Sequence, residues 1–195
     1  MLIRTVAVLA RRNMAKAAPD GVDQEEFLTA VAEDTYEMVA GLELVTPVLV
    51  TSVPGLEEIV WPGTEVITMD DDEPLKDVIR RLPGDQAAVV NADAPDLPPL
   101  LIGKLFRELG RAQLALCPSE YGGAVALACH LPLPGWADPD LDAHDPVADL
   151  RAQAPGRRMV AASPGWHRLR TPDDVLRLDP GLEGWDNTRA LLGKF

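Results

Sequence analysis

The sequence predicts an α/β fold in three layers, with helices on both faces of a mostly parallel sheet. Apolar, β-branched runs alternate with helical segments from residue 2 to about residue 117, an alternation typical of such sheets. The run at residues 86–91 is almost wholly apolar, as expected of a strand that is covered on both faces. With 195 residues, 47% hydrophobic and 25% charged, the chain has the size and composition of one globular domain, which we expect to span residues 1–195.

The first elements are an apolar strand at residues 2–10 and a helix at residues 23–40. The helix begins with an acidic turn and carries an apolar face, and Gly41 ends it. A second strand is expected at residues 46–52, because a Pro-Gly pair closes this β-branched run. A short helix at residues 56–60 follows it.

The middle of the chain continues the alternation. A short strand at residues 65–68 precedes an acidic run that opens a helix at residues 74–82, because carboxylates favour the positive end of a helix. The buried strand at residues 86–91 leads to a helix at residues 98–110, which has proline in its first turn. A strand at residues 113–117 comes next.

The last third of the chain begins with a strand at residues 123–129, which leads into a loop rich in proline and aspartate. A helix at residues 146–154 and a strand at residues 158–162 follow. The final helix is expected at residues 171–178, because Thr171 is a good N-cap and a proline and two aspartates occupy the first turn.

The composition excludes several classes of partner. There are 31 acidic and 18 basic residues, a formal net charge of −13, and such a surface repels the phosphate backbone of nucleic acids. Cys117 and Cys129 lie inside apolar runs, which indicates buried free thiols in a reducing compartment. No apolar stretch approaches the ~18 residues that a membrane helix needs, and the run at residues 5–10 is too short for a signal peptide. We therefore expect a cytoplasmic protein that binds neither nucleic acid nor membranes.

Two loops follow the carboxyl ends of predicted strands, which is where ligands bind in sheets of this kind. The first loop contains Arg11, Arg12, Asn13 and Lys16. Three cations so close together in an acidic protein can form a cradle for the phosphates of a nucleotide. A solvated basic turn would have the same composition, so both interpretations stand.

The second loop follows the strand at residues 86–91 and contains Asp93 and Asp96. A carboxylate at this point can hold Mg²⁺ against substrate phosphates, or it can cap the helix that comes next. We expect Asp93 to be the metal ligand and Asp96 to be the helix cap. The chain has neither the P-loop motif nor the glycine motif of dinucleotide-binding folds.

Four segments, in order along the chain, carry a resemblance to a known superfamily. They are the first strand with its lysine-bearing loop, then ADAPDLPPLLIGKLFREL, LCPSEYGGAVALA and RTPDDVLRL. The chain resembles the nucleotidyltransferase-like superfamily with the GT-A, or nucleotide-diphospho-sugar transferase, fold. Within it the chain is most similar to a bacterial glycosyltransferase-like group related to the 2-phospho-L-lactate and molybdopterin-cofactor guanylyltransferases.

The resemblance implies roles for individual residues. Asp93 matches the family's metal-binding aspartate, which implies Mg²⁺ or Mn²⁺ as a cofactor, and Lys16 matches a lysine that contacts nucleotide phosphates. These two residues are the implied catalytic pair. Gly122 and Gly123 match a glycine pair that lets the backbone approach the second substrate, since glycine has no side chain to collide with it.

The chain also departs from the family pattern. Ala18 stands where relatives have a phosphate-binding arginine, and Tyr121, beside Glu120, replaces an aspartate before the glycine pair. Arg168 and Arg170 replace two aspartates of the last motif. Either a guanidinium substitutes for Mg²⁺ in offsetting phosphate charge, or the domain no longer catalyses. We expect four of these residues to border the substrate: Glu120, Tyr121, Arg168 and Arg170.

The sequence therefore predicts a nucleotide-dependent transferase. It would move a nucleotidyl or glycosyl group from an NTP or a nucleotide-sugar to a small-molecule acceptor, assisted by a divalent metal. The alternative is a non-catalytic domain of the same fold that binds a nucleotide or a protein partner. The oligomeric state is left open and includes a homo-oligomer. The segment at residues 185–195 either docks on a partner or closes the core of its own chain.

Overall fold

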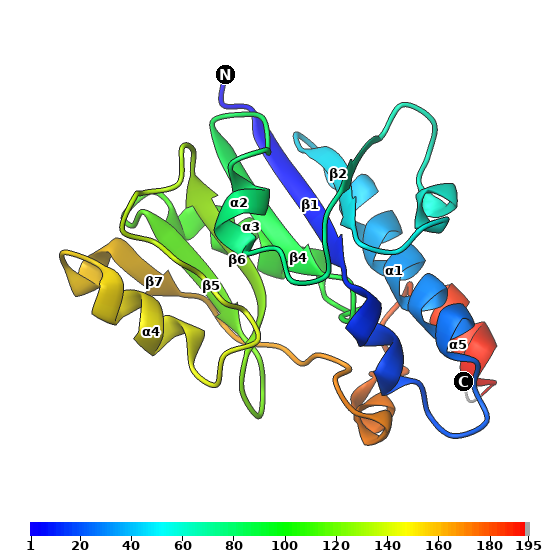
Figure 1. The fold of residues 1–195 in the computed structure, drawn as a ribbon. Coiled ribbons are helices and arrows are strands. Elements are labelled where there is room, and N and C mark those ends of the chain that lie inside the picture. Colours follow the sequence, from blue (N-terminus) through cyan, green and yellow to red (C-terminus); the bar gives the residue numbers. More distant parts are fainter. Residues whose placement is uncertain (194–195) are drawn as a thin grey trace.

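A seven-stranded sheet forms the centre of the molecule (Figure 1). The computed structural model describes residues 1–193, and the strand order is β3-β2-β1-β4-β6-β5-β7. Within this part of the chain, β6 runs antiparallel to β4 and β5, and the other pairings are parallel. The strands are β1 (Arg4–Ala10), β2 (Thr46–Thr51), β3 (Glu65–Thr68), β4 (Gln86–Asn91), β5 (Leu114–Pro118), β6 (Ala124–His130) and β7 (Val160–Ala162). Each lies where the sequence predicts it, which confirms the mostly parallel α/β sheet.

The helices also follow the prediction, with three short additions. The α-helices are α1 (Gln24–Ala40), α2 (Leu75–Ile79), α3 (Pro99–Glu108), α4 (Pro146–Gln153) and α5 (Asp186–Leu192). The 3₁₀-helices are η1 (Arg12–Ala17), η2 (Leu56–Ile59), η3 (Arg157–Met159) and η4 (Pro172–Arg177). The additions are η1, η3 and α5, and η3 overlaps the start of the strand predicted at residues 158–162. Periodicity predicts neither η1 nor α5, because each is short and lacks an extended apolar face of its own.

Helices cover both faces of the sheet and create two apolar cores. The side chains of β1 alternate between the cores, with Val6 and Val8 on one face and Ala7 and Leu9 on the other, as the two-residue repeat of a strand requires. Helices α1, α3 and α5 pack on the Val8 face, whereas α2 and α4 pack on the Leu9 face. In Figure 1, α2 and α4 lie in front of the sheet. These layers confirm the predicted three-layer architecture.

The C-terminal segment closes the core of its own chain. Helix α5 lies beside α1 (Figure 1), and Asp34 of α1 accepts hydrogen bonds from the backbone N–H groups of Asn187 (3.1 Å) and Thr188 (2.7 Å). Trp185 is buried at the start of α5. The last two residues of the predicted segment, 194–195, lie outside the described residues, so the one-domain span of 1–195 stays a prediction.

The strand register gathers the functional loops at one edge. Leu9 of β1 pairs with Asn91 of β4, and Ala10 pairs with Thr51 of β2. These parallel strands therefore end together, and the loops that follow them share the carboxyl edge of the sheet.

Two further expectations concern burial and membranes. Cys117 and Cys129 are buried free thiols, and desolvation raises their pKa values to about 11 and about 12. Among residues 1–193, the helices are all too short or too polar to cross a bilayer.

Candidate functional site

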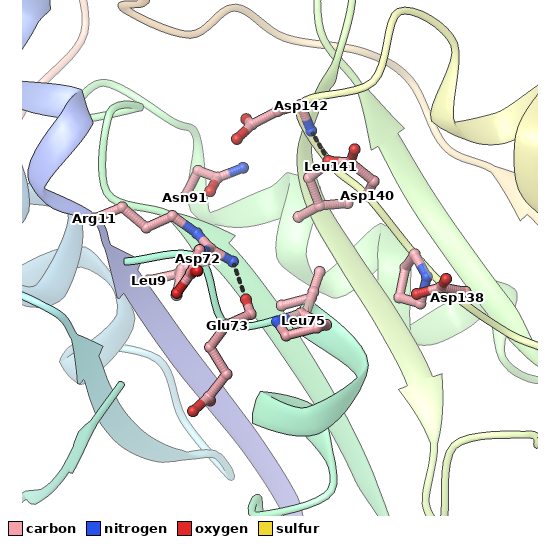
Figure 2. Close-up of a pocket in the computed structure, with 12 residues that line it drawn as sticks. Leu9, Arg11, Asp72, Glu73, Leu75, Asn91, Asp138, Asp140, Leu141 and Asp142 are labelled. Carbon is pink, nitrogen blue, oxygen red and sulfur yellow. Dashed lines mark hydrogen bonds between the residues drawn. The ribbon is translucent and has the colours of Figure 1, made fainter. Parts of the chain in front are cut away.

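A crevice of about 320 Å³ opens at the carboxyl ends of β1 and β4 (Figure 2). Arg11 and Asn91 form one side of it, and the segment that carries Asp140 and Asp142 forms the other. The complete lining is Leu9, Arg11, Asp72, Glu73, Pro74, Leu75, Asn91, Asp138, Pro139, Asp140, Leu141 and Asp142. Arg11 is the basic residue in a lining that is otherwise rich in carboxylates. This is the position in the fold where the sequence predicts ligand binding.

Arg11 is held in place by the loop that follows β3. Its guanidinium donates to the carbonyl oxygens of Asp71 (2.8 Å) and Glu73 (3.1 Å), the second of which is marked in Figure 2. These two bonds fix the direction of the guanidinium before any ligand arrives. A pre-oriented donor of this kind loses little entropy when it binds an anion.

The other predicted phosphate-binding residues lie on η1, outside the lining of the crevice. Arg12 is exposed and pairs with Asp71, with 3.4 Å between Arg12 Nε and Asp71 Oδ2. A hydrogen bond from Ser52, followed by the charge of Arg12, lowers the pKa of the Asp71 carboxyl. Asn13 and Lys16 are exposed on the same short helix. The structure thus brings Arg11 to the crevice and leaves the rest of the loop on the neighbouring surface.

Asp93 lies at the same edge, yet its carboxylate is not open to the crevice. The residue is 1% exposed. Arg168 Nε donates to Oδ1 of Asp93 (2.9 Å), and Arg168 Nη2 donates to Oδ2 (3.0 Å). Both carboxylate oxygens therefore belong to one bidentate ion pair, a geometry in which guanidinium and carboxylate match closely.

The same guanidinium joins Asp93 to the wall of the crevice. Arg168, 4% exposed, also donates from Nη1 to Asp142 Oδ1 (2.7 Å) and to the carbonyl oxygen of Leu141 (3.2 Å). Burial alone would lower the pKa of Arg168, but the charges of Asp93 and Asp142 raise it above its ordinary value. Burial alone would raise the pKa of Asp142, but the charges of Arg168, Arg170 and Arg11 and the Arg168 hydrogen bond together lower it.

This arrangement does not fit a metal ion at Asp93. A divalent cation needs free carboxylate oxygens, and both oxygens of Asp93 already accept from a buried cation. Across residues 1–193, no group of three or more acidic, histidine or cysteine side chains is placed to hold a metal ion.

The glycine pair is in close contact with the chain itself. Gly122 and Gly123 have φ angles of 106° and 82°, a region that side chains disfavour. A Cβ atom on Gly123 would lie 2.9 Å from Arg170 Nη1 and 2.9 Å from the carbonyl oxygen of Leu141. The space beside these glycines is therefore occupied by the segment that carries Arg168 and Arg170 and by the loop at residues 141–144.

Of the remaining predicted residues, Glu120 and Tyr121 sit at the tip of the β5–β6 hairpin, and Arg170 precedes η4. Tyr121 is 83% exposed, and the guanidinium of Arg177 from η4 lies 3.8 Å from the centre of its ring. Glu120 Oε2 is 4.0 Å from Arg177. Arg170, just before η4, lies 4.0 Å from Asp142. Glu120 and Tyr121 therefore contact η4 through Arg177, and Arg170 lies beside Asp142 of the crevice wall.

The expected helix cap at Asp96 is wrong. Helix α3 has Pro98 at its N-cap and no side-chain cap. Asp96 instead accepts hydrogen bonds from Trp166 Nε1 (3.1 Å), His167 Nε2 (2.9 Å) and the backbone N–H of Asp179 (3.0 Å). It therefore anchors the segment that carries Arg168 against the loop that carries Asp93.

Sequence reasoning missed the acidic walls of the crevice. The run at residues 70–73 is interpreted from sequence as a helix start, but α2 begins at Leu75, and Asp72 and Glu73 line the crevice. The position of this run in the sequence could have indicated that it lines the crevice, because the run follows the carboxyl end of β3. Asp142 carried no comparable signal, since its role depends on contact with a distant arginine.

The fold is shared with several solved structures. A proposed nucleotide-diphospho-sugar transferase from Desulfovibrio desulfuricans superposes with a TM-score of 0.69 at 17% identity, over 100% of this chain and 95% of that one. A CMP:2-keto-3-deoxy-manno-octonic acid synthetase in complex with CTP gives 0.60 at 13% identity, over 98% and 99%. Rv0371c from Mycobacterium tuberculosis, in complex with manganese, gives 0.55 at 18% identity, over the full length of both chains.

No protein-family model matches the chain, and no curated protein matches it by sequence. The comparisons with solved structures therefore establish the fold: the chain has the nucleotide-diphospho-sugar transferase fold. This confirms the fold expected from the resemblance. Because every identity is below one fifth, the neighbours show the fold alone.

Proposed function

We propose that this chain is a nucleotide-dependent transferase that works in the crevice at the carboxyl edge. It would transfer a nucleotidyl or glycosyl group from an NTP or nucleotide-sugar to a small acceptor. The observation that carries the proposal is the pre-oriented guanidinium of Arg11 in a crevice between the ends of β1 and β4. Ligands bind at this edge in open α/β sheets, and neighbours with the same fold include a synthetase bound to CTP.

Arg11 is proposed to bind the phosphates of the donor. Because its guanidinium is already oriented, it offsets their charge without reorganisation. Lys16 and Arg12 on η1 add positive charge at the entrance, where exposed side chains can follow a polyphosphate that extends from the crevice. Transfer by direct displacement depends mainly on such positioning and charge, so this proposal needs no strong base.

Asp93 is proposed to act as a positioning residue. It holds Arg168, and Arg168 holds the Asp142 wall of the crevice. Since the Asp93 oxygens do not fit Mg²⁺ or Mn²⁺, we derive no step through a metal at this residue. Arginine and lysine side chains are proposed to offset the phosphate charge instead.

A second candidate function is nucleotide binding without turnover. The saturated Asp93–Arg168 pair favours it, because the carboxylate that matches the family's metal ligand is occupied. The cytoplasmic location and the homo-oligomer considered from the sequence remain predictions under either function.

Titration calorimetry with ATP, GTP, CTP and UTP, each with and without Mg²⁺ or Mn²⁺, tests the site. We expect binding without added metal that weakens about tenfold or more in Arg11→Gln, the loss of one charged hydrogen-bond partner. Lys104→Gln, on helix α3 and outside the lining of the crevice, removes one charge as a control and should bind normally. Binding that requires metal and disappears in Asp93→Asn would overturn the metal-free assignment. Absence of nucleotide binding would overturn both functions.

Turnover separates the two candidates. Incubation with each NTP or nucleotide-sugar and a panel of phosphorylated and hydroxylated acceptors should release pyrophosphate or a nucleoside diphosphate. Nucleotide binding without any release across the panel would support the second candidate.

A further inference from the structure

A second cavity, of about 520 Å³, lies beside the edge strand β7. Four arginines line it, together with the three residues of β7. They are Arg111, Arg151, Arg157 and Arg158. Among the described residues 1–193, no acidic side chain contributes to this lining, although the chain has 31 acidic and 18 basic residues. The charged side chains that line this cavity are therefore all positive, although the molecule as a whole is acidic; Glu108, outside the lining, pairs with one of them, Arg111.

This basic cavity is separate from the crevice. Arg111 precedes β5, and Arg157 and Arg158 precede β7. Because β5 and β7 run parallel to each other and to β4, these arginines lie at the amino edge of the sheet. The crevice occupies the carboxyl edge, at the opposite ends of the strands.

Two of the arginine side chains are held by the chain, and the other two side chains have no partner among residues 1–193. Arg151 Nε donates to the carbonyl oxygen of Val160 (3.3 Å), and Arg111 Nε donates to Glu108 (2.7 Å). The side chains of Arg157 and Arg158 are exposed, and within residues 1–193 neither guanidinium group makes a hydrogen bond or an ion pair, although the carbonyl oxygen of Arg157 accepts from the backbone N–H of Val160. The cavity therefore combines two oriented guanidinium groups with two whose donors are free.

Like charges that share one cavity repel each other, and a bound anion relieves that repulsion. Guanidinium forks match phosphate oxygens in pairs, better than point charges do. We propose that the basic cavity binds a small polyanion bearing at least two phosphate groups. Its volume suits such a molecule, which would be bound between the fixed pair and the free pair of arginines.

The edge strand itself does not favour an extended peptide. Strand β7 has three residues, and the carbonyl oxygen of Val160 already accepts from Arg151. Addition of a strand depends on free backbone groups along the edge. Charged side chains beside an edge strand can also serve only to prevent pairing with another sheet, and the experiment below distinguishes that role from binding.

Inorganic pyrophosphate, without divalent metal, is the probe for the full chain. Titration calorimetry should show saturable binding that weakens with added salt. Arg157→Gln/Arg158→Gln should reduce the affinity about tenfold or more, since two charged donors are lost. Lys104→Gln/Arg107→Gln on α3 removes the same net charge and should leave the affinity unchanged. Circular dichroism checks that both double variants are folded.

Two further arms assign the position and the chemistry. Amide NMR shifts on pyrophosphate addition should centre on Ala161 and Ala162; shifts confined to Arg11 and Asn91 would place the anion in the crevice and overturn the proposal. Citrate, a trivalent polycarboxylate, should bind more weakly than pyrophosphate, and equal binding would overturn the phosphate assignment. Absence of pyrophosphate binding, or an equal loss in both double variants, would leave only the edge-protecting role.

Discussion

The buried pair of Asp93 and Arg168 leads to a quantitative prediction about stability. Arg168→Met keeps most of the aliphatic side chain but removes the guanidinium, which leaves Asp93 at 1% exposure with no cation. Breaking a buried ion pair by removing one partner costs about 3–5 kcal/mol. The two bidentate bonds, at 2.9 and 3.0 Å, are charge-assisted, and at ~1.5–3 kcal/mol each they give a similar figure.

The partner variant should cost less. Asp93→Asn leaves Arg168 paired with Asp142 at 2.7 Å, so the guanidinium keeps one carboxylate. The double variant should then be more stable than the sum of the two single losses predicts, with a coupling energy on the order of 2–3 kcal/mol. Arg170→Met is the matched control, because Arg170 is partly exposed and lies 4.0 Å from Asp142. Its loss should stay within ~1 kcal/mol.

Urea denaturation followed by circular dichroism and tryptophan fluorescence measures these free energies of unfolding. The variants must share one m-value for the comparison to hold. If Arg168→Met loses less than ~1 kcal/mol, or if the two single losses simply add within ~0.5 kcal/mol, Asp93 is not held by Arg168. The carboxylate would then be free to bind a metal.

Three further predictions concern other parts of the structure. Asp34→Ala removes the acceptor of the first N–H groups of α5, so it should cost ~1–3 kcal/mol and raise amide exchange in α5 more than in the sheet. Gly123→Ala should cost about 1–3 kcal/mol in urea denaturation, because its φ is 82° and the new Cβ would meet atoms at 2.9 Å. Gly103→Ala, in α3 with no atom within 4 Å of the new Cβ, should instead stabilise slightly, and equal losses would refute the strain. Burial raises the thiol pKa values of Cys117 and Cys129 to about 11 and about 12. The free energy of unfolding should therefore stay constant below the thiol pKa of the unfolded chain, about 8.5, and should fall as the pH rises above it. Both thiols should resist a thiol reagent until urea unfolds the chain, and rapid labelling of the native protein would contradict their burial.

The sequence was sufficient for most of the architecture. Strand and helix positions follow from local patterns of two and 3.6 residues, from glycine and proline at turns, and from apolar runs. Those patterns indicate the parallel sheet and the loops at its carboxyl edge. They also indicate the burial of Cys117 and Cys129. The sequence patterns did not predict the short helices η1 and α5, because these helices depend on packing against α1 more than on their own sequence.

The chemistry of the site was decided by contacts between distant residues. From the sequence, Asp93 could be a metal ligand and Asp96 a helix cap, because each carboxylate stands at the right position for that role. The folded chain instead pairs Asp93 with Arg168, 75 residues away, and Asp96 with His167, 71 residues away. A local pattern fixes which edge of the sheet a carboxylate occupies. Only the tertiary structure selects its partner, because that choice depends on which charges the loops after β4 and β7 bring within hydrogen-bond distance.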